Sequence, residues 1–247
     1  MNGNPLRPTI QRTDRGGAGV HTSASSARYA AAGHSCQPGD ALIVVDVQND
    51  FLPGGVLAVP GGGGVIEPLN GYIQQFARLR LPVFATRDWH PREHCSFRQH
   101  GGRWPPHCVA GTQGAKFPSE LQLPPEVRVI SKATQPEADA YSGFQGTDLA
   151  PQLRDLGCRR VFIGGLATEY CVRATVLDAR AAGLQVVVLA DAIRALDAQP
   201  GDGEHALAEM KASGAQVSPG RRLPGAQVPD GEVAGRSPPR LEVTCSS

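Results

Sequence analysis

Short apolar runs alternate with helix-like patterns along the middle of this chain, and this alternation limits the folds open to it. Runs of strand length lie at residues 41–47, 83–88, 127–131, 160–165 and 185–191. Most are unbroken stretches of Val, Ile, Leu and Phe, typical of parallel strands covered on both faces. Helical patterns lie at residues 66–79, 148–156, 172–182 and 204–213. The chain is therefore predicted to form a doubly wound α/β fold, with a mainly parallel sheet of five or six strands and helices on both faces.

The two ends of the chain differ in composition from its middle. Residues 1–38 are rich in Gly, Ser, Ala and Arg, and prolines recur from residue 219 onward. Such segments hold too few large apolar residues to form a core. We therefore expect one α/β domain over residues 39–217, between disordered tails at 1–38 and 218–247.

Composition excludes several classes of partner. The formal net charge is only +1, so no basic surface for nucleic acid is expected. No apolar run approaches the roughly 18 residues of a membrane span. The six cysteines contain no C-x-x-C pair, which argues against a disulfide scaffold and favours a reducing cytoplasm. The N-terminus lacks a secretory apolar segment, and its Arg, Ser and Ala content leaves an organellar transit peptide as a less favoured alternative.

Residues able to do chemistry follow four of the predicted strands. Asp46 closes the first run, Asp88 and His90 the second, Lys132 the third, and Cys171 follows the fourth. In doubly wound folds, ligands bind outside the carboxyl ends of the strands. We therefore expect these side chains to meet along one edge of the sheet.

Cys171 stands between a strand pattern and a helix pattern. The positive end of a helix dipole favours thiolate over thiol, so this position suits a nucleophile, although a buried structural cysteine is the alternative. Asp46 would be a desolvated general base, or else the cap of a turn. Lys132 would hold both anions and lower the pKa of the thiol, unless it is an ordinary solvated lysine.

A second group has the chemistry of a metal site. Asp88 and His90 form an Asp-x-His pair, and His107 follows in a Trp-Pro-Pro-His segment. Carboxylate and imidazole together suit zinc, manganese or iron. Two or three histidines with one aspartate leave positions open for water or substrate, as in a catalytic site. Surface or capping roles fit His94 and His100 better than His90 and His107.

Six segments stand in order along residues 40–217: DVQNDF at 46–51, DWH at 88–90, WPPHC at 104–108, Lys132, YSGF at 141–144 and GLATEYCVR at 165–173. Together they resemble the motifs of the nicotinamidase/pyrazinamidase group within the isochorismatase-like cysteine hydrolases. The resemblance implies hydrolysis of nicotinamide, and also of pyrazinamide, to the acid and ammonia through a thioester intermediate, as a step of NAD salvage.

The resemblance also implies roles for individual residues. Cys171 would be the nucleophile, Asp46 the base and Lys132 the third member of the catalytic set. The backbone amides of Ala167 and Cys171 would form an oxyanion hole, next to a cis peptide bond between Leu166 and Ala167.

Two further sets of side chains follow from the same resemblance. Phe51, Trp104 and Tyr141 would line an aromatic substrate slot, although Phe51 and Trp104 also fit a plain core. Asp88, His90 and His107 would bind one divalent ion, with zinc the first choice and iron or manganese the alternatives. His94 matches a ligand found in only some members of the family.

Three other functions compete with this interpretation. A ureido or carbamoyl amidohydrolase would use the same catalytic set but has little need of the metal group. An isochorismatase-type hydrolase is disfavoured by Cys171, and a non-catalytic metal- or partner-binding relative is disfavoured by the complete catalytic set. The oligomeric state, including a homo-oligomer, is left open. The last strand is expected at residues 215–217, cut short by Pro219 and Gly220.

Overall fold

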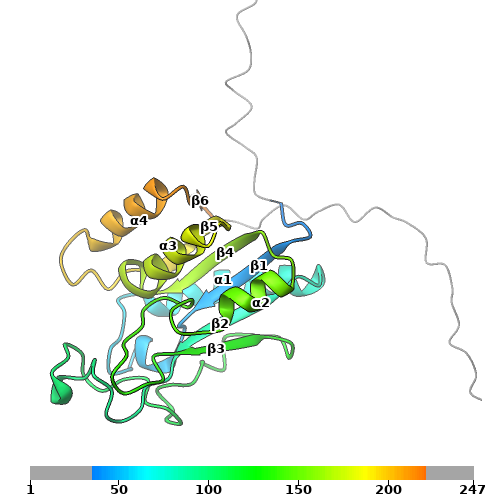
Figure 1. The fold of residues 1–247 in the computed structure, drawn as a ribbon. Helices are drawn as coiled ribbons and strands as arrows, with labels where there is room; N and C mark the ends of the chain where they lie inside the picture. The colour runs from blue at the N-terminus through cyan, green and yellow to red at the C-terminus, as the bar shows by residue number, and fades with distance from the viewer. Residues whose placement is uncertain (1–34, 221–247) are drawn as a thin grey trace, which may run out of the picture. The chain divides into compact units, whose positions relative to one another are not determined.

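The computed structural model describes residues 35–220, so the predicted tails lie almost entirely outside the described residues and stay predictions. The sheet has six strands in the order β3-β2-β1-β4-β5-β6, with every neighbouring pair parallel (Figure 1). The strands are β1 Asp40–Val45, β2 Val83–Asp88, β3 Arg128–Lys132, β4 Arg160–Leu166, β5 Gln185–Arg194 and β6 Gln216–Ser218. The strand order reverses between β1 and β4, and this confirms the predicted doubly wound fold.

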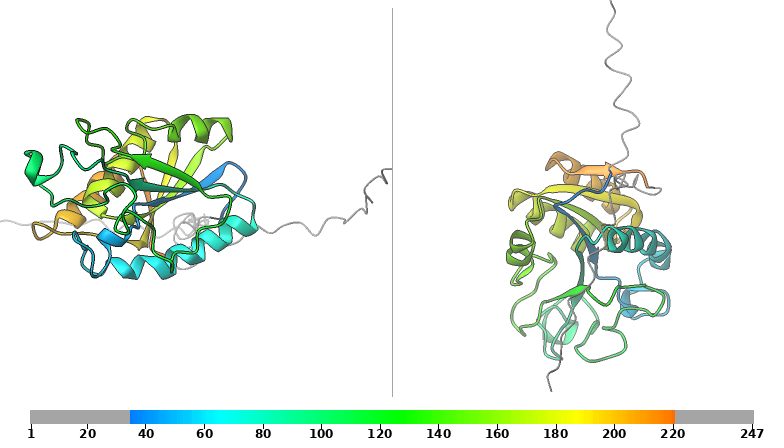
Figure 2. Two further views of the ribbon diagram at one scale, coloured as in Figure 1. Left: turned by 90° about the horizontal axis from the view of Figure 1, so that it is seen from below. Right: turned by 90° about the vertical axis from the view of Figure 1, so that its right-hand side faces the viewer.

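Helices cover both faces of the sheet. They are α1 Ile66–Arg78, α2 Leu149–Asp155, α3 Arg173–Ala181 and α4 Asp202–Ala212. Figure 2 shows α1 on one side of the sheet and α2 and α3 on the opposite side. Four short turns complete the elements: η1 Asn49–Phe51, η2 Gly62–Val65, η3 Arg98–His100 and the π-helical turn η4 Thr168–Val172.

Strand β1 shows why its sequence is apolar after Asp40. Successive side chains of a strand point to opposite faces. Leu42 and Val44 pack into the cluster that contains Phe76 of α1, whereas Ile43 packs with Leu149 of α2. Residues 41–45 of β1 are all buried, so neither face leaves room for an alternating polar residue, and the buried Asp40 at the start of the strand is paired with Arg160. Burial of each such side chain contributes roughly 1.5–3 kcal/mol, and this central strand anchors both layers.

The pairing of β4 with β5 is irregular and explains one difference from the sequence prediction. The register shifts between Ile163 and Gly165, after which Gly165 pairs with Ile193. As a result, β5 continues to Arg194 instead of ending at residue 191. Gly165 has a φ of +133°, and a Cβ there would lie 2.0 Å from the Val45 carbonyl oxygen, so this position requires glycine.

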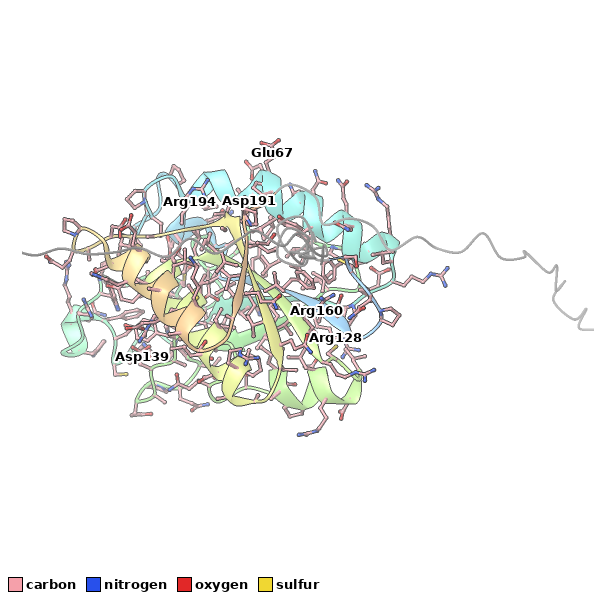
Figure 3. The ribbon with its side chains drawn as sticks, turned by 90° about the horizontal axis from the view of Figure 1, so that it is seen from above. Glu67, Arg128, Asp139, Arg160, Asp191 and Arg194 are labelled. Atoms are coloured by element: carbon pink, nitrogen blue, oxygen red, sulfur yellow. The ribbon has the colours of Figure 1, made fainter. Side chains whose placement is uncertain are left out.

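The two ends of the strands differ in the residues that they carry. Figure 3 shows Arg128 and Arg160, from the first positions of β3 and β4, on the side away from Asp139, which follows β3. The short β6 matches the expected truncated last strand. Within residues 35–220, no helix combines the length and the apolar character that crossing a membrane requires.

Candidate active site

Lys132 lies at the centre of the residues that the sequence placed at the strand ends. Its side chain is buried, and its Nζ lies 3.0 Å from Asp46 Oδ2 and 3.5 Å from Cys171 Sγ. The same nitrogen contacts Asp88 Oδ1 and donates to the Ala140 carbonyl at 3.1 Å. Lys132 therefore contacts both of the other predicted members of the catalytic set, Asp46 and Cys171.

Strand register explains this convergence. Asp88 and Lys132 are the last residues of β2 and β3 and stand opposite each other in the parallel pairing. Asp46 follows the end of β1, and its backbone N–H donates to Thr86 of β2 at 3.2 Å. The Thr86 hydroxyl also donates to Asp46 Oδ1 at 2.6 Å. Asp46 adopts a φ of +48°, so its backbone is held in an uncommon conformation at the site.

The charges in this group stabilise one another. Burial raises the pKa of Asp46, and although the Lys132 ammonium opposes this, the pKa stays above its usual value. Burial alone would lower the pKa of Lys132, but Asp46 and Asp88 raise it well above the usual range. Lys132 is therefore a permanent cation, beside a carboxylate with raised proton affinity. This is the property required of a general base.

The thiol of Cys171 behaves differently from the sequence expectation. Burial raises its pKa well above the usual value, and the lowering effect of Lys132 is insufficient to reverse this. The expectation of a thiolate stabilised by a helix dipole is therefore wrong for the resting site. Cys171 lies inside the π-helical turn η4 and is only 6% exposed, so desolvation outweighs the dipole. The resting thiol keeps its proton and needs a base to remove it.

The turn that carries Cys171 begins at a cis peptide bond. The bond between Leu166 and Ala167 is cis, as predicted. The Ala167 carbonyl then accepts hydrogen bonds from the amides of Tyr170 and Val172, at 3.1 and 3.2 Å. The use of the Ala167 and Cys171 amides as an oxyanion hole stays a prediction, and both residues line the same cavity.

Asp88, His90 and His107 form a group with the chemistry of a metal site. One ligand atom from each lies within 4.8 Å of the others. His90 Nδ1 is 3.3 Å from the Ala133 carbonyl, and His107 Nδ1 is 2.8 Å from the Pro105 carbonyl. Since a carbonyl accepts only a proton donor, Nδ1 carries the hydrogen in both rings and Nε2 carries a lone pair.

The Nε2 atom of His90 shows that these residues fit a cation. It is buried and has no hydrogen-bond partner among the described residues, and it lies 3.7 Å from Asp88 Oδ2. Burial also lowers the pKa of His107, which favours the neutral ring that binds metals. The Lys132 ammonium keeps the pKa of Asp88 below its usual range although burial acts in the opposite direction. A carboxylate and two imidazoles thus offer one ligand atom each around one point.

His94 lies next to this group but in a different bonding state. It is fully buried, so the expected surface role is wrong, whereas His100 is exposed as expected. The ring centroids of His94 and His90 are 4.1 Å apart. His94 Nδ1 is 2.8 Å from Ser96 Oγ, and Nε2 is 3.2 Å from the Ala138 carbonyl. Both ring nitrogens are engaged by the protein, and a ligand role for His94 stays a prediction.

A narrow, mainly apolar cavity opens above the thiol. Phe51, Trp104 and Tyr141 line it, as the resemblance implied, and the Trp104 indole N–H donates to the Tyr141 hydroxyl at 3.1 Å. Tyr170, which the sequence did not single out, packs its ring edge-on to Trp104 with centroids 5.3 Å apart. The remaining lining residues are Leu57, Val59, Asp88, His107, Ala167, Cys171 and Leu196.

Two residues of the first motif hold the site in place, although the motif alone assigned no role to either. The Gln48 side chain donates from Nε2 to the carbonyls of Asp88 and Ala115, at 2.8 and 2.9 Å, and accepts from the Asp88 amide at 2.8 Å. Asp50 accepts the Cys108 amide at 2.7 Å, next to His107. Their position within a motif could have suggested importance, but Thr86 carried no sequence signal at all.

Comparisons with known proteins agree with this geometry. The isochorismatase domain matches residues 40–221. The nicotinamidase of Escherichia coli K12 is 39% identical over 201 residues, covering 73% of this chain and 94% of that protein. The zinc complex of Pyrococcus horikoshii pyrazinamidase is 52% identical with a TM-score of 0.71, covering 73% of this chain and 99% of that one. The nicotinate complex of PnC1 from L. infantum is 39% identical with a TM-score of 0.69, covering 75% and 94%. The chain therefore belongs to the isochorismatase family, as its motifs predicted.

Proposed function

We propose that this protein is a nicotinamidase, a cysteine amidohydrolase that converts nicotinamide to nicotinic acid and ammonia and also accepts pyrazinamide. The observation that carries the proposal is the buried contact of Lys132 with Asp46 and Cys171 at the floor of an aromatic cavity. The similarity to known nicotinamidases and pyrazinamidases supports the same activity. Release of nicotinic acid places the enzyme in NAD salvage.

The first half of the reaction forms a thioester. Asp46, which has a carboxylate oxygen within 4.8 Å of the sulfur, takes the proton of the Cys171 thiol, and Lys132 stabilises the resulting anion. The sulfur then attacks the carboxamide carbon, and the negative oxygen rests on the backbone amides of Ala167 and Cys171. One such donor is typically worth about 3 kcal/mol in the transition state. The carbon–nitrogen bond breaks as Asp46 returns its proton to the departing ammonia.

The second half of the reaction releases the acid. Asp46, again a carboxylate, removes a proton from a water molecule that attacks the thioester carbon. The carbon–sulfur bond breaks, and the thiol of Cys171 regains its proton. Because the pKa of Cys171 is high, the resting enzyme returns to the neutral thiol. Throughout both halves Lys132 stays charged and limits the cost of moving charge between Asp46 and Cys171.

Asp88, His90 and His107 would hold one divalent ion, and zinc fits the carboxylate and imidazole donors. When bound, the ion supplies a Lewis acid that can bind the ring nitrogen of the substrate and orient it. Phe51, Trp104 and Tyr141 contribute flat apolar walls for the ring. The walls and the ion would together hold the carboxamide at Cys171.

A substrate panel with ammonia detection tests the proposal. Nicotinamide and pyrazinamide should release ammonia, whereas N-carbamoyl and ureido compounds should not. Efficient cleavage of a carbamoyl compound with no turnover of nicotinamide would favour the sibling amidohydrolase. Binding of zinc without turnover of any amide would favour a non-catalytic relative.

The proposal also covers the cellular compartment and the partners of the enzyme. The described cysteines Cys36, Cys95, Cys108, Cys158 and Cys171 are all free thiols, which supports a reducing compartment such as the cytoplasm. The partner is a small molecule. Sedimentation of the purified protein would decide between a monomer and a homo-oligomer.

A further inference from the structure

Leu196 lines the aromatic cavity although none of the strand-end motifs contains it. It lies in the loop between β5 and α4, just beyond Arg194, and is half-buried. Its aliphatic side chain therefore shares a wall with the aromatic residues that would hold the substrate ring. A residue in this place limits how large a ring the cavity can accept.

The Glu169 carboxylate fixes the position of this loop. Its Oε2 accepts the Leu196 amide at 3.2 Å, and its Oε1 accepts the Asp197 amide at 2.7 Å. Hydrogen bonds to an ionised group are stronger than those between neutral partners. Glu169 stands two residues before Cys171, inside the same turn η4. The turn that carries the thiol and the loop that carries Leu196 are thus tied together by one side chain.

The loop is also tightened from its far side. Asp197 adopts a φ of +49°, and its Oδ1 accepts the Gly203 amide at 2.8 Å. A Cβ at Gly203 would lie 2.6 Å from the Cβ of Ala195, so the first turn of α4 packs closely on the start of the loop. Leu196 is therefore held between two fixed points, Glu169 on one side and the start of α4 on the other.

We propose that Leu196 sets the ring size that the cavity accepts, and that Glu169 is a positioning residue that holds Leu196 against the substrate slot. The proposal rests on the proposed function. The expected substrates are single-ring aromatic carboxamides, and fused two-ring carboxamides are excluded by the Leu196 side chain. Differences of one or a few methylene groups in an apolar pocket typically change discrimination by about 10–200-fold.

The size limit is tested by Leu196→Ala, with Leu156→Ala as the matched control. Leu156 lies at the other end of the molecule, after α2, and is 41% exposed. The measurement is the ratio of kcat/KM for quinoline-3-carboxamide to kcat/KM for nicotinamide. Leu196→Ala should raise this ratio by about tenfold or more, and Leu156→Ala should leave it unchanged. An unchanged ratio in Leu196→Ala overturns the proposal.

The positioning role is tested by Glu169→Gln, with Glu204→Gln on the exposed side of α4 as the control. A glutamine keeps one carbonyl oxygen but turns an NH₂ group toward the second amide, so one of the two hydrogen bonds is lost. KM for nicotinamide should rise by roughly 3–10-fold while kcat changes by less than about twofold. A fall in kcat at constant KM would overturn the positioning role. In the Leu196→Ala background, Glu169→Gln should add little further change to the ring-size ratio.

A separate measurement keeps this inference distinct from the proposed function. If the wild-type protein releases no ammonia from any carboxamide, the proposed function fails, but the cavity can still be probed at Cys171. Iodoacetamide and N-(1-pyrenyl)maleimide would be compared as alkylating agents, with Cys171 modification followed by peptide mass spectrometry. Leu196→Ala should increase the rate at which the pyrenyl reagent modifies Cys171 about ten times more than it increases the rate for iodoacetamide. Leu156→Ala should change neither rate. Equal changes for both reagents overturn the size limit.

Discussion

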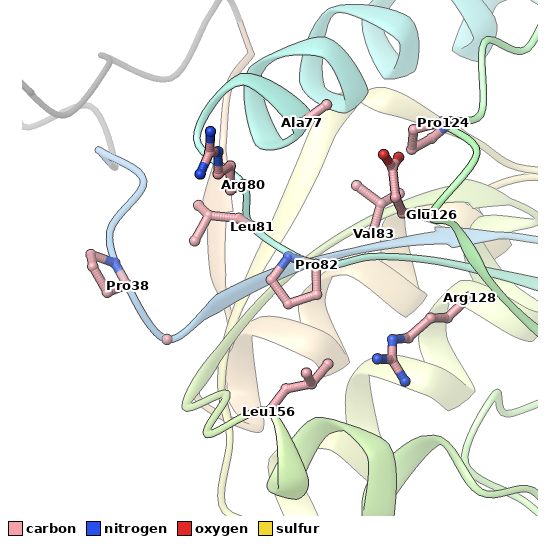
Figure 4. A pocket seen from close by; sticks show the side chains of 11 residues that line it. Pro38, Ala77, Arg80, Leu81, Pro82, Val83, Pro124, Glu126, Arg128 and Leu156 are labelled. Atoms are coloured by element: carbon pink, nitrogen blue, oxygen red, sulfur yellow. The ribbon is translucent and has the colours of Figure 1, made fainter. Parts of the chain in front are cut away.

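Two cavities lie at opposite ends of the same parallel strands, and the candidate catalytic residues are at the smaller one. The groove at the amino ends has a volume of about 670 Å³, whereas the cavity above Cys171 measures about 40 Å³. Figure 4 shows Arg80, Glu126 and Arg128 around the larger groove, and all three residues are exposed. At the carboxyl ends, Asp46 and Lys132 are at most 1% exposed. Desolvated, mutually paired charges therefore identify the active site better than the size of a hollow does.

The two ends also differ in their thiols, and the largest expected effect uses this difference. Cys36 stands two residues before Pro38, which lines the amino-end groove, whereas Cys171 contacts Lys132. Cys171→Ala should lower ammonia release from nicotinamide by at least about 10⁴-fold, because no other group can form the thioester. Cys36→Ala should keep the activity within about twofold of wild type. Full activity in Cys171→Ala would show that the nucleophile is assigned wrongly.

Strand β3 offers the sharpest test of buried against exposed charge, because it begins with Arg128 and ends with Lys132. Lys132→Met leaves the carboxylates of Asp46 and Asp88 buried without their cation, so the free energy of unfolding should fall by about 3–5 kcal/mol. Arg128→Met, at the exposed end, should change it by less than about 0.5 kcal/mol. Urea denaturation followed by circular dichroism measures both values. Similar losses in the two variants would contradict the contrast between the two ends.

Metal removal should affect only the candidate active site at the carboxyl ends of the strands. A chelator should lower turnover of nicotinamide by roughly 10–100-fold, and zinc should restore it. His90→Ala removes a ligand, so the purified protein should hold less than one equivalent of metal by elemental analysis. The exposed His100 supplies the control, because His100→Ala should keep the metal content of wild type. Activity that survives exhaustive chelation would remove the metal from the proposed mechanism.

The smallest effect concerns the pH dependence of stability at the amino end. Burial raises the pKa of Cys36 from 9.0 to about 12, with a contribution from Asp40. The unfolded chain releases this proton near pH 9, and the folded chain only near pH 12. The stabilisation is therefore complete below pH 9 and is lost as the pH rises toward 12. Urea titrations between about pH 8 and pH 11 should show that the free energy of unfolding declines less steeply with pH for Cys36→Ala than for wild type. Identical slopes would mean that Cys36 ionises freely in the folded protein.

The fold and most of the site could be predicted from sequence because both depend on short-range patterns. An apolar run such as β1 and the glycine after α2 each indicate a structure locally. In doubly wound folds, ligands bind outside the carboxyl ends of the strands, so residues that follow different strands lie at one edge of the sheet. Asp46 and Lys132 could therefore be expected to lie close together. The positions that required glycine or a cis bond were part of the GLATEYCVR motif.

What the sequence did not predict depends on register and on burial. Thr86 looks like any β-branched strand residue until its pairing with Val45 places its hydroxyl beside Asp46. Leu196 lies in the loop after β5, and the shift in register with β4, which extends β5 to Arg194 and so sets where this loop begins, could not be foreseen. The pKa of Cys171 was expected in the wrong direction, since a helix-dipole argument takes no account of desolvation by a fold not yet known.

Gln48 explains how β1 and β2 can separate to form a crevice although the backbone of a sheet is fully hydrogen-bonded. Where parallel strands separate, their peptide groups lose their partners, and an unpaired buried peptide group is costly. The carboxamide of Gln48 has the same donor and acceptor as a peptide, and it meets both the N–H and the C=O of Asp88. It therefore acts as one extra residue of strand, so that β1 and β2 can diverge without loss. Glutamate lacks the donor and leucine lacks both groups, so neither could replace Gln48 in keeping the sheet open at this point.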